Sequence, residues 1–349
     1  MGGKHRQFKI NIPFKEIINK GAQILIQKGF GEKKDIESIE ENGCLSGADI
    51  KNLSPQAIHR AEKEIGTLGS GNHFIEIQML KEIFNQDLAD KWGLFEGQIC
   101  FMIHTGSRAL GHQTCLDYTQ KFFKEESKYG IKAPVHNLAS LPTDSPTGAA
   151  YLSAMAGCVN FAFANRQLIT HFVRKVFCET LTSHPSTSFR ASNSRLTLLY
   201  DVAHNIAKWE IHHGKKVLVH RKGATRALPA GHPQNPKHYL KTGHPAIVPG
   251  SMGTASYIMV GLPKAQETFY SINHGAGRTM SRGEAKRTIK IQDFERKMSG
   301  IIYNKPLGMI VDEAPQAYRN IDLVIETLTE AGIAQKVAKL YPLAVIKGD

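Results

Sequence analysis

The sequence predicts a protein of mixed helices and strands, of the α/β or α+β class, folded as one continuous domain over residues 1–349. Short apolar runs that end in turn-rich clusters recur along the chain, and long segments with helical spacing separate them. Hydrophobic residues make up 41% of the 349 positions, which is enough for a substantial core. No repeat or low-complexity tract interrupts the pattern.

Four segments are predicted to be helices. Residues 14–28 carry apolar side chains at helical spacing and are followed by Gly29, a common end signal. Residues 147–181 open after Pro146 and are rich in Ala, Met and Phe, which predicts a long helix with small residues on one face. Two shorter helices, 316–329 and 333–340, are expected to close the chain.

Six apolar runs are predicted to be strands, because each is short and ends in turn-forming residues: 74–80, 98–103, 196–202, 216–219, 256–260 and 268–272. The segment 229–249, with five prolines and three histidines, is predicted to be an ordered surface loop.

Charge and cysteine content limit the class of protein. Lysine and arginine total 44 against 31 acidic residues, a formal charge of +13 spread along the chain, which favours a polyanionic partner but is also common in enzymes of small substrates. Five cysteines without a CxxC spacing indicate neither a disulfide framework nor a cysteine-rich zinc site. No apolar run has the length of a signal peptide core or a membrane span, so we expect a soluble, cytoplasmic protein.

Four histidines mark a candidate site. His104, His204 and His274 follow the apolar segments QICFMI, LTLLYDVA and TFYSIN, and His73 lies in the glycine-rich segment GTLGSGNHFIEIQ. Imidazoles that converge from several loops would suit Mn, Fe, Co or Zn. Each histidine alone is equally compatible with a hydrogen-bonded core or surface residue.

Three further segments contain residues that could bind phosphate or react with it. In NHGAGR, a histidine nitrogen could attack phosphorus, and Arg278 could bind a phosphate as a fork, although a glycine turn with a structural histidine fits too. VHRKGATRALPAGHP, from residue 219, is basic enough for a nucleotide or nucleic-acid backbone, or is a solvated basic loop. VPGSMGTASY, from residue 248, offers hydroxyls that could bind a base or phosphate, or form plain turns.

Read in order, these segments resemble the signature blocks of the RtcB family of RNA ligases. The blocks are GTLGSGNHFIEI, IHTGSRALGHQ, YLSAMAGCVNFAFANR, DVAHNIAKWE, VHRKGATRALPAGHP, VPGSMGTASY, NHGAGRTMSR, DEAPQAYRNID and PLAVIKG, between about Glu40 and Lys347. The resemblance implies an α+β fold with mixed central sheets and surrounding helices.

The resemblance also implies an activity. Such enzymes use GTP and two manganese ions to join RNA ends bearing a 3′-phosphate or 2′,3′-cyclic phosphate to 5′-hydroxyl ends, in tRNA splicing and RNA repair. RNA, as tRNA halves or broken ends, and GTP would be the partners, with no membrane. The need for an activator such as archease, the physiological RNA and the oligomeric state stay open.

Site residues follow from the resemblance, position by position. His274 would attack the α-phosphate of GTP to form a histidine–GMP intermediate, with Arg278 and Asn72 on phosphate oxygens. His104 and His204 would bind one manganese ion and His73 the second. The positions that match guanine-nucleotide contacts are Glu76, Ser251, Ser256, Tyr318 and Lys347. A carboxylate at Glu76 could accept from guanine N1 and N2, although an exposed strand residue is the plain alternative.

One family element is not found. Members carry an Asp-x-x-Cys pair of manganese ligands upstream of the first block, and none of the five cysteines here has that context. We therefore expect an N-terminally incomplete ligase, from a misplaced start, a split gene or a decayed copy, with severely reduced activity alone. The alternatives are a non-catalytic RNA- or GTP-binding remnant and a metal-dependent phosphoesterase that forms no His274–GMP.

Overall fold

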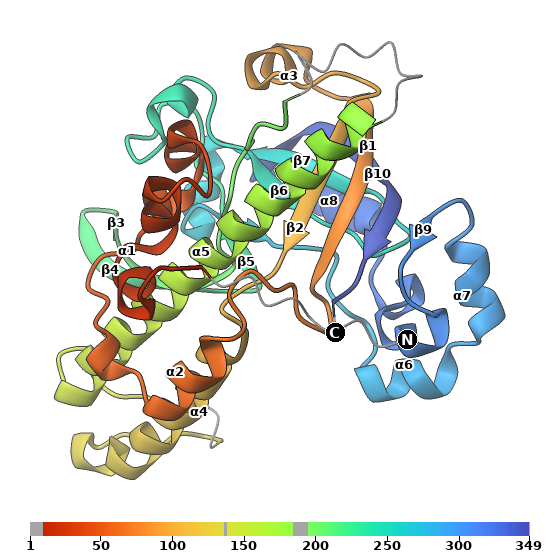
Figure 1. Ribbon diagram of the computed structural model, residues 1–349. Helices are drawn as coiled ribbons and strands as arrows, with labels where there is room; N and C mark the ends of the chain where they lie inside the picture. The colour runs from red at the N-terminus through yellow and green to blue at the C-terminus, as the bar shows by residue number, and fades with distance from the viewer. Residues whose placement is uncertain (1–9, 136–137, 184–194, 349) are drawn as a thin grey trace. The chain divides into compact units, whose positions relative to one another are not determined.

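A computed structural model describes residues 10–135, 138–183 and 195–348 (Figure 1). Helices and strands are mixed along the chain, and the strands form one larger and two smaller sheets, which confirms the α+β class. The chain forms two compact units, of which the first comprises residues 1–67 and 105–198 and the second residues 68–104 and 199–349. The single domain expected over residues 1–349 stays a prediction.

The first unit is helical. Its α-helices are α1 (Phe14–Gln27), α2 (Pro55–Ala61), α4 (Arg108–Glu125) and α5 (Pro146–Ser183), joined by 3-10 turns. The core forms where α1 packs on α5, through Ile18, Leu25, Phe161 and Leu168 among others. Gly157 of α5 permits this close approach, because a Cβ there would lie 2.9 Å from the Cγ2 atom of Ile18.

The predicted helices at 14–28 and 147–181 are confirmed by α1 and α5. Helices α2 and α4 were not predicted, since α4 is polar and has no strong apolar stripe. By length and composition α5 could cross a membrane, but 56% of its most apolar stretch is buried inside the structure, as in the core helix of a soluble protein.

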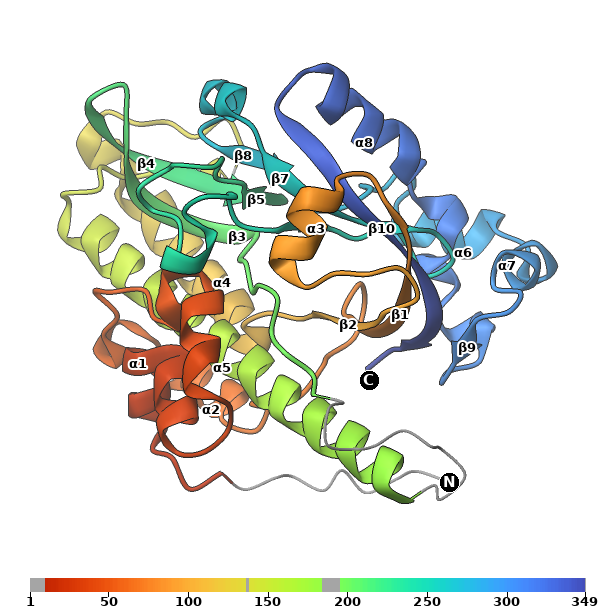
Figure 2. The same ribbon diagram turned by 90° about the horizontal axis from the view of Figure 1, so that it is seen from above.

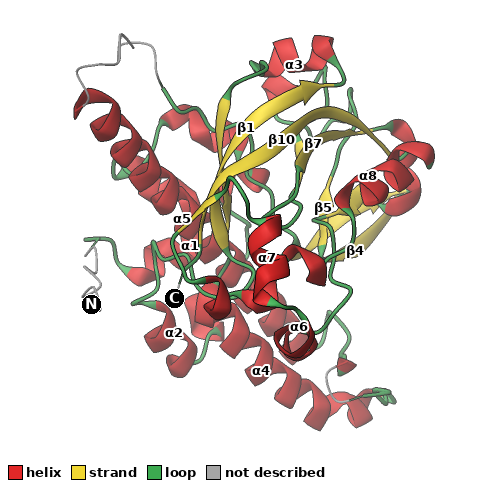
Figure 3. Cartoon of the chain, turned by 90° about the vertical axis from the view of Figure 1, so that its right-hand side faces the viewer, coloured by secondary structure: helices red, strands yellow, loops and turns green. Residues whose placement is uncertain are grey.

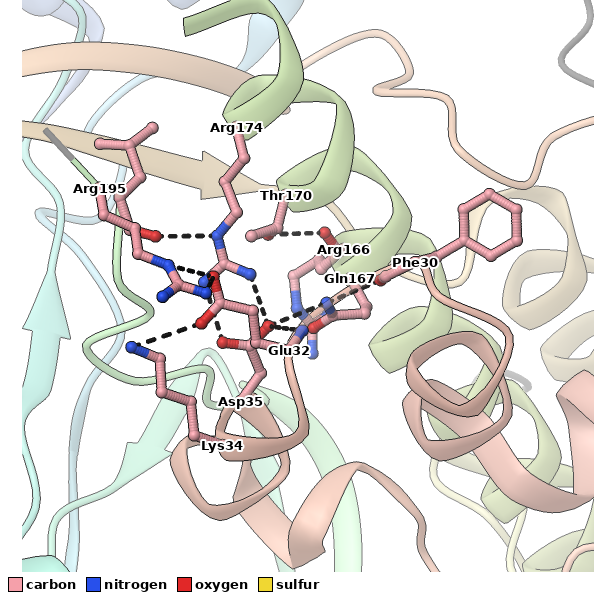
Figure 4. Close-up of polar contacts among 10 residues, drawn as sticks. Phe30, Glu32, Lys34, Asp35, Arg166, Gln167, Thr170, Arg174 and Arg195 are labelled. Atoms are coloured by element: carbon pink, nitrogen blue, oxygen red, sulfur yellow. Dashed lines mark hydrogen bonds and ion pairs between the residues drawn. The ribbon is translucent and has the colours of Figure 1, made fainter. Parts of the chain in front are cut away.

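A buried ion pair holds the first unit together beside α5 (Figure 4). Asp35 is 1% exposed, and both its carboxylate oxygens accept from Arg174, at 2.5 and 2.9 Å. The backbone N–H of Glu32 and the amide of Gln167 also donate to it. Burial alone would raise the pKa of Asp35, but the hydrogen bonds from Arg174 and Glu32 lower it below its usual value.

The second unit is built on a six-stranded sheet. The strands run in the order β2 (Ile99–His104), β1 (Phe74–Ile83), β10 (Ala334–Ile346), β7 (Ser256–Gly261) and β6 (Ala246–Val248), and the short β9 (Ile302–Tyr303) also pairs with β10. All neighbours are antiparallel except β9 and β10. The sheet is therefore mixed, as expected.

Helices cover both faces of this sheet, and α3 and α8 lie on opposite sides of β10 (Figure 2). Helix α3 (Gln86–Trp92) packs on Ile258 and Val260, and α8 (Ile321–Glu330) packs on Tyr257 and Met259, since alternate residues of β7 face opposite ways. Helices α6 (Arg282–Thr288) and α7 (Ile291–Lys297) follow one another in the chain (Figure 3), and α7 lies beside β9 (Figure 1).

Two small sheets complete the second unit. Strands β3 (Asn205–His212) and β4 (Lys215–Lys222) form a hairpin, and β5 (Ala224–Arg226) pairs with β8 (Ser271–Asn273). The chain passes from β4 through Gly223 directly into β5, so the hairpin ends next to a strand that pairs with β8, the strand that leads to His274.

Several predicted elements are corrected. The segment 333–340 was expected as a helix, but residues 334–340 form part of β10, because this strand is buried on both faces and so shows no alternation of polar and apolar residues. Residues 196–202 are not a strand, and the strand of this region, β3, begins at Asn205. The helix expected at 316–329 begins only at Ile321, after a 3-10 turn.

The remaining elements are close to expectation. The strands at 74–80, 98–103, 216–219 and 256–260 are confirmed by β1, β2, β4 and β7, whereas only the end of 268–272 overlaps β8. The segment 229–249 was expected on the surface, but Tyr239, His244 and Ala246 are buried in it. It contains β6 and contributes to the core.

Candidate functional site

The four predicted histidines lie together in the second unit. His73 directly precedes β1, and His104 ends β2, where it pairs with Phe74 across the strands. The Nε2 atoms of His104 and His204 are 3.0 Å apart. Ring centroids lie 4.5 Å apart for His204 and His274, and 6.1 Å apart for His73 and His104. Residues that span 200 positions of sequence therefore form one cluster.

The 3.0 Å separation of the two Nε2 atoms is that of a hydrogen bond between the rings of His104 and His204, and it also leaves both nitrogens close enough to bind one ion. Burial, followed by the neighbouring imidazoles, lowers the pKa of His104 well below its usual value, so its ring is neutral and has a lone pair. Within the described residues, no group of three or more His, Cys, Asp or Glu could hold a metal. The pair fits part of a site.

His274 is held in one orientation by Gly223. Its Nδ1 atom lies 2.8 Å from the Gly223 carbonyl oxygen, so Nδ1 carries the proton and Nε2 keeps a lone pair. The backbone N–H of Gly223 donates to the His204 carbonyl oxygen at 2.9 Å. Burial lowers the pKa of His274, and the bond to Gly223 opposes this. The result is a neutral imidazole whose Nε2 is available as a nucleophile.

Glu76 is buried beneath the sheet surface beside polar partners. The side-chain amide of Gln78 donates to Glu76 at 2.7 Å and to the Ser256 hydroxyl at 3.0 Å. Burial raises the pKa of Glu76 to about 8, although Gln78 and the charge of Lys347 oppose it. Burial lowers the pKa of Lys347, also to about 8. Glu76 is therefore a buried carboxylate and not the exposed strand residue that the sequence also allowed.

Arg278 is bound to its own chain. It donates to the Asp312 carbonyl oxygen at 2.7 Å, to the Met280 carbonyl oxygen at 3.0 Å and to the Tyr318 hydroxyl at 3.0 Å. Tyr318 in turn donates to Glu313. Much of the Arg278 fork is thus occupied, so a bound phosphate would have to share or displace these contacts.

The other predicted residues differ in exposure. Asn72 is exposed in the turn before β1, whereas Ser251 is buried and its hydroxyl lies 3.0 Å from the Thr254 hydroxyl. In the basic segment from residue 219, His220 and Lys222 are exposed, but Arg221 and Arg226 are buried. These two arginines therefore do not present their charge to a surface ligand.

Three residues of the site were not identified from the sequence: Gln78, Gly223 and Glu313. Gln78 lies two positions after Glu76, so the period of a strand already places both side chains on one face. Gly223 acts through its backbone carbonyl, and Glu313 acts through a contact with Tyr318, five positions away. Only their places within the glycine-rich and acidic blocks could have indicated them.

Comparisons with known proteins agree with one family. The sequence model of the tRNA-splicing ligase RtcB family matches residues 2–348. The tRNA-splicing ligase RtcB of Thermococcus kodakarensis is 44% identical over 341 residues, which cover 95% of this chain and 70% of that protein. The RNA-splicing ligase RtcB of Mycobacterium bovis is 42% identical over 340 residues, 95% of this chain and 76% of that protein.

Coverage of the relatives varies. The tRNA-splicing ligase RtcB of Methanocaldococcus jannaschii is 45% identical over 95% of this chain, but the match spans only 35% of that protein. This chain therefore spans about a third of that relative's length.

Proposed function

The chain belongs to the tRNA-splicing ligase RtcB family, and we propose that it is an RNA ligase in which His274 carries GMP. The single observation that supports this role is the hydrogen bond from His274 Nδ1 to the Gly223 carbonyl oxygen, which leaves Nε2 unprotonated inside a cluster of imidazoles. GTP and RNA with a 3′-phosphate or 2′,3′-cyclic phosphate and a 5′-hydroxyl end are the proposed substrates.

Three transfers make up the reaction. Nε2 of His274 bonds to the α-phosphorus of GTP, and pyrophosphate leaves. The Nδ1 proton stays in place, where the Gly223 carbonyl offsets the positive charge of the ring. An oxygen of the RNA 3′-phosphate, which with a 2′,3′-cyclic end forms first when water attacks the phosphorus and the 2′ oxygen leaves as a hydroxyl, then attacks the GMP phosphorus and returns the electron pair to Nε2. Finally the 5′-hydroxyl loses its proton and attacks the RNA phosphorus, and GMP leaves.

His104 and His204 would hold one manganese ion and His73 a second. When bound, these ions would supply positive charge that offsets the reacting phosphates. Glu76, with Ser251, Ser256, Tyr318 and Lys347, would bind the guanine nucleotide, while Asn72 and Arg278 would bind phosphate oxygens. Manganese prefers oxygen ligands beside imidazole, so further ligands must complete both sites.

The experiment is incubation of the purified chain with α-labelled GTP and manganese, followed by denaturing electrophoresis. We expect a covalent label on the parent chain and none on His274→Ala, with His274→Asn as a second control of similar size. A parent chain that stays unlabelled until a polypeptide with the Asp-x-x-Cys element is added would assign the remaining metal ligands to that element. A label that persists in both variants would refute the role of His274.

A non-catalytic RNA- or GTP-binding protein is the second candidate. One observation favours it. Among the described residues, His104 and His204 lie close enough to bind one ion, but they are not part of a group of three or more His, Cys, Asp or Glu that could hold it. GTP binding without any label, under every metal tested, would support it. Cytoplasmic location and use of an activator such as archease are proposed with the ligase role.

A further inference from the structure

The β3–β4 hairpin has two unlike faces. Its register places Asn205, Trp209 and Ile211 opposite Lys222, Leu218 and Lys216, and directly opposite residues share a face. The other face carries Lys208, Glu210 and Arg221, which are buried. One face is therefore held against the protein, while the other, the outward face, is exposed at Asn205, Trp209 and Ile211, with Ala207 buried between them.

The buried face anchors the hairpin firmly. Arg221 makes a two-point ion pair with Glu210, at 2.6 and 2.9 Å, and also donates to the Ser271 hydroxyl and the Phe269 carbonyl oxygen. His212 lies 2.9 Å from the same carboxylate. Ser271 begins β8, the strand that ends just before His274. The hairpin is thus fixed to the segment that carries the proposed nucleophile.

The outward face combines an aromatic ring with positive charge. Trp209 is 47% exposed and Ile211 63% exposed, and the Lys216 ammonium lies 5.2 Å from the centre of the Trp209 ring. His220 and Lys222 are exposed on the same face. Within residues 205–222, all of which the structure describes, the single carboxylate is Glu210, on the buried face. Only cationic side chains therefore charge this surface.

This face leads to the catalytic cluster. Lys222, its last cation, directly precedes Gly223, which binds both His204 and His274, and the Lys222 charge acts on His274. Trp209 is opposite Leu218, four residues before Lys222, or about 13 Å along the strand. An extended polyanion bound at His274 could continue along the hairpin.

We propose that the outward face of the β3–β4 hairpin is a docking track for single-stranded RNA that leaves the catalytic cluster. Trp209 stacks on a base, and Lys216, His220 and Lys222 contact the backbone. The assignment rests on the proposed ligase function for its polyanion. Charge complementarity and continuity with His274 favour RNA over a second copy of this chain, which would bring like charges together.

The test uses the intrinsic fluorescence of Trp209. The sequence contains two tryptophans, so Trp92→Phe leaves Trp209 as the only one. A short single-stranded oligoribonucleotide ending in a 3′-phosphate is titrated into this variant, and its binding is followed in parallel by the anisotropy of a labelled copy. We expect fluorescence quenching with the same midpoint as the anisotropy change. Binding by anisotropy with unchanged Trp209 fluorescence would overturn the proposal.

Surface variants give a second readout. Trp209→Ala should weaken RNA binding about tenfold, and Trp209→Tyr should retain most of it, since both rings stack. Lys216→Ala should reduce the dependence of log affinity on log salt by about 0.7. Phe95→Ala is the matched control, because Phe95 is 60% exposed and lies before β2, at the end opposite His104. Equal loss in Phe95→Ala, or normal binding in Trp209→Ala, contradicts the track.

Two outcomes separate this proposal from others. Labelling of His274 by GTP needs no RNA, so it should be unchanged in Trp209→Ala, and its absence in the parent would count against the ligase role alone. If Trp209→Ala instead lowers the molar mass in light scattering and leaves RNA affinity unchanged, the face is an interface between copies and the proposal is wrong.

Discussion

Two buried carboxylates, Asp35 in the first unit and Glu76 in the second, differ in how they are bonded. In the first, Asp35 receives four hydrogen bonds, two of them from Arg174, and its pKa is lowered. In the second, Glu76 receives a bond from Gln78, and burial raises its pKa to about 8. A buried carboxylate whose hydrogen-bonding positions are filled stabilises a fold, whereas a carboxylate with unused acceptor positions can still bind a ligand.

The histidine cluster extends this contrast. The Nε2 atoms of His104 and His204 face each other at 3.0 Å, so a hydrogen bond between them requires one ring to donate and the other to accept. This part of the second unit therefore brings imidazoles together, whereas Asp35 of the first unit is paired with a guanidinium.

The largest effect is expected from Asp35→Ala, which leaves Arg174 buried without its partner. The free energy of unfolding of the first unit should fall by about 3–5 kcal/mol. Urea unfolding followed by circular dichroism measures it. The matched variant Asp35→Ala with Arg174→Met removes both charges and should recover a large part of the loss. If the single variant is as stable as the parent, the ion pair is not important for the fold.

The second largest effect is expected from Gly223→Ala, which should slow the reaction of His274 with GTP. Gly223 has φ +70°, and an added Cβ would lie 3.4 Å from Cε1 and Nδ1 of His274. Strain of about 1–3 kcal/mol and a displaced imidazole are expected, and a small misplacement reduces rate about 100-fold. The rate of His274 labelling by GTP measures this, with Gly214→Ala, φ +74° in the hairpin turn, as the control for strain alone.

Glu76→Gln should change how stability depends on pH. Because the folded pKa of Glu76 is raised to about 8 from 4.5, the folded protein retains a proton that the unfolded chain loses, so this group's stabilising contribution is present below pH 4.5 and is lost as pH rises to 8. The variant should therefore lose less stability over that window, by about 1–3 kcal/mol at pH 8. Thermal unfolding at pH 5, 6.5 and 8 tests this, and parallel profiles would contradict it.

The smallest effect is expected from Lys91→Ala in α3. Lys91 and Asp87 form an ion pair of 2.7 Å, but both side chains are more than half exposed, at 53% and 73%. Such pairs contribute about 0.5 kcal/mol or less. An effect of the same size as that of Asp35→Ala would show that burial is not what distinguishes the two pairs.

The sequence predicted the site better than the fold around it. Histidines at the ends of apolar runs were expected to converge, and His73, His104, His204 and His274 do lie together. Only His73 and His104 lie at the edge of one sheet, because His204 and His274 adjoin β3 and β8 of the two small sheets. Their proposed roles stay predictions. Gln78 and Gly223 were not predicted. Gln78 acts on the neighbouring side chain of Glu76 and Gly223 acts through its backbone carbonyl, and neither role is indicated by the residue type.

Errors in the fold have a common physical origin. The segment 333–340 was expected as a helix because Ala334, Val337, Ala338 and Leu340 have helical spacing. In β10 they are buried on both faces, and a register shift between Lys336 and Ala338 breaks the strand's alternation. Pairing with β1 and β7 decides the conformation, and those partners are distant in sequence.

The packing of α1 on α5 affects how the chain is made. About 120 residues separate the end of α1 from the start of α5, and the second unit's first two strands lie between them. At a synthesis rate of about 5–20 residues per second, α1 leaves the ribosome roughly 6–24 s before α5 begins to follow. During that interval its apolar stripe, including Ile18 and Leu25, is without its partner. We expect the nascent chain to be a chaperone client until α5 emerges.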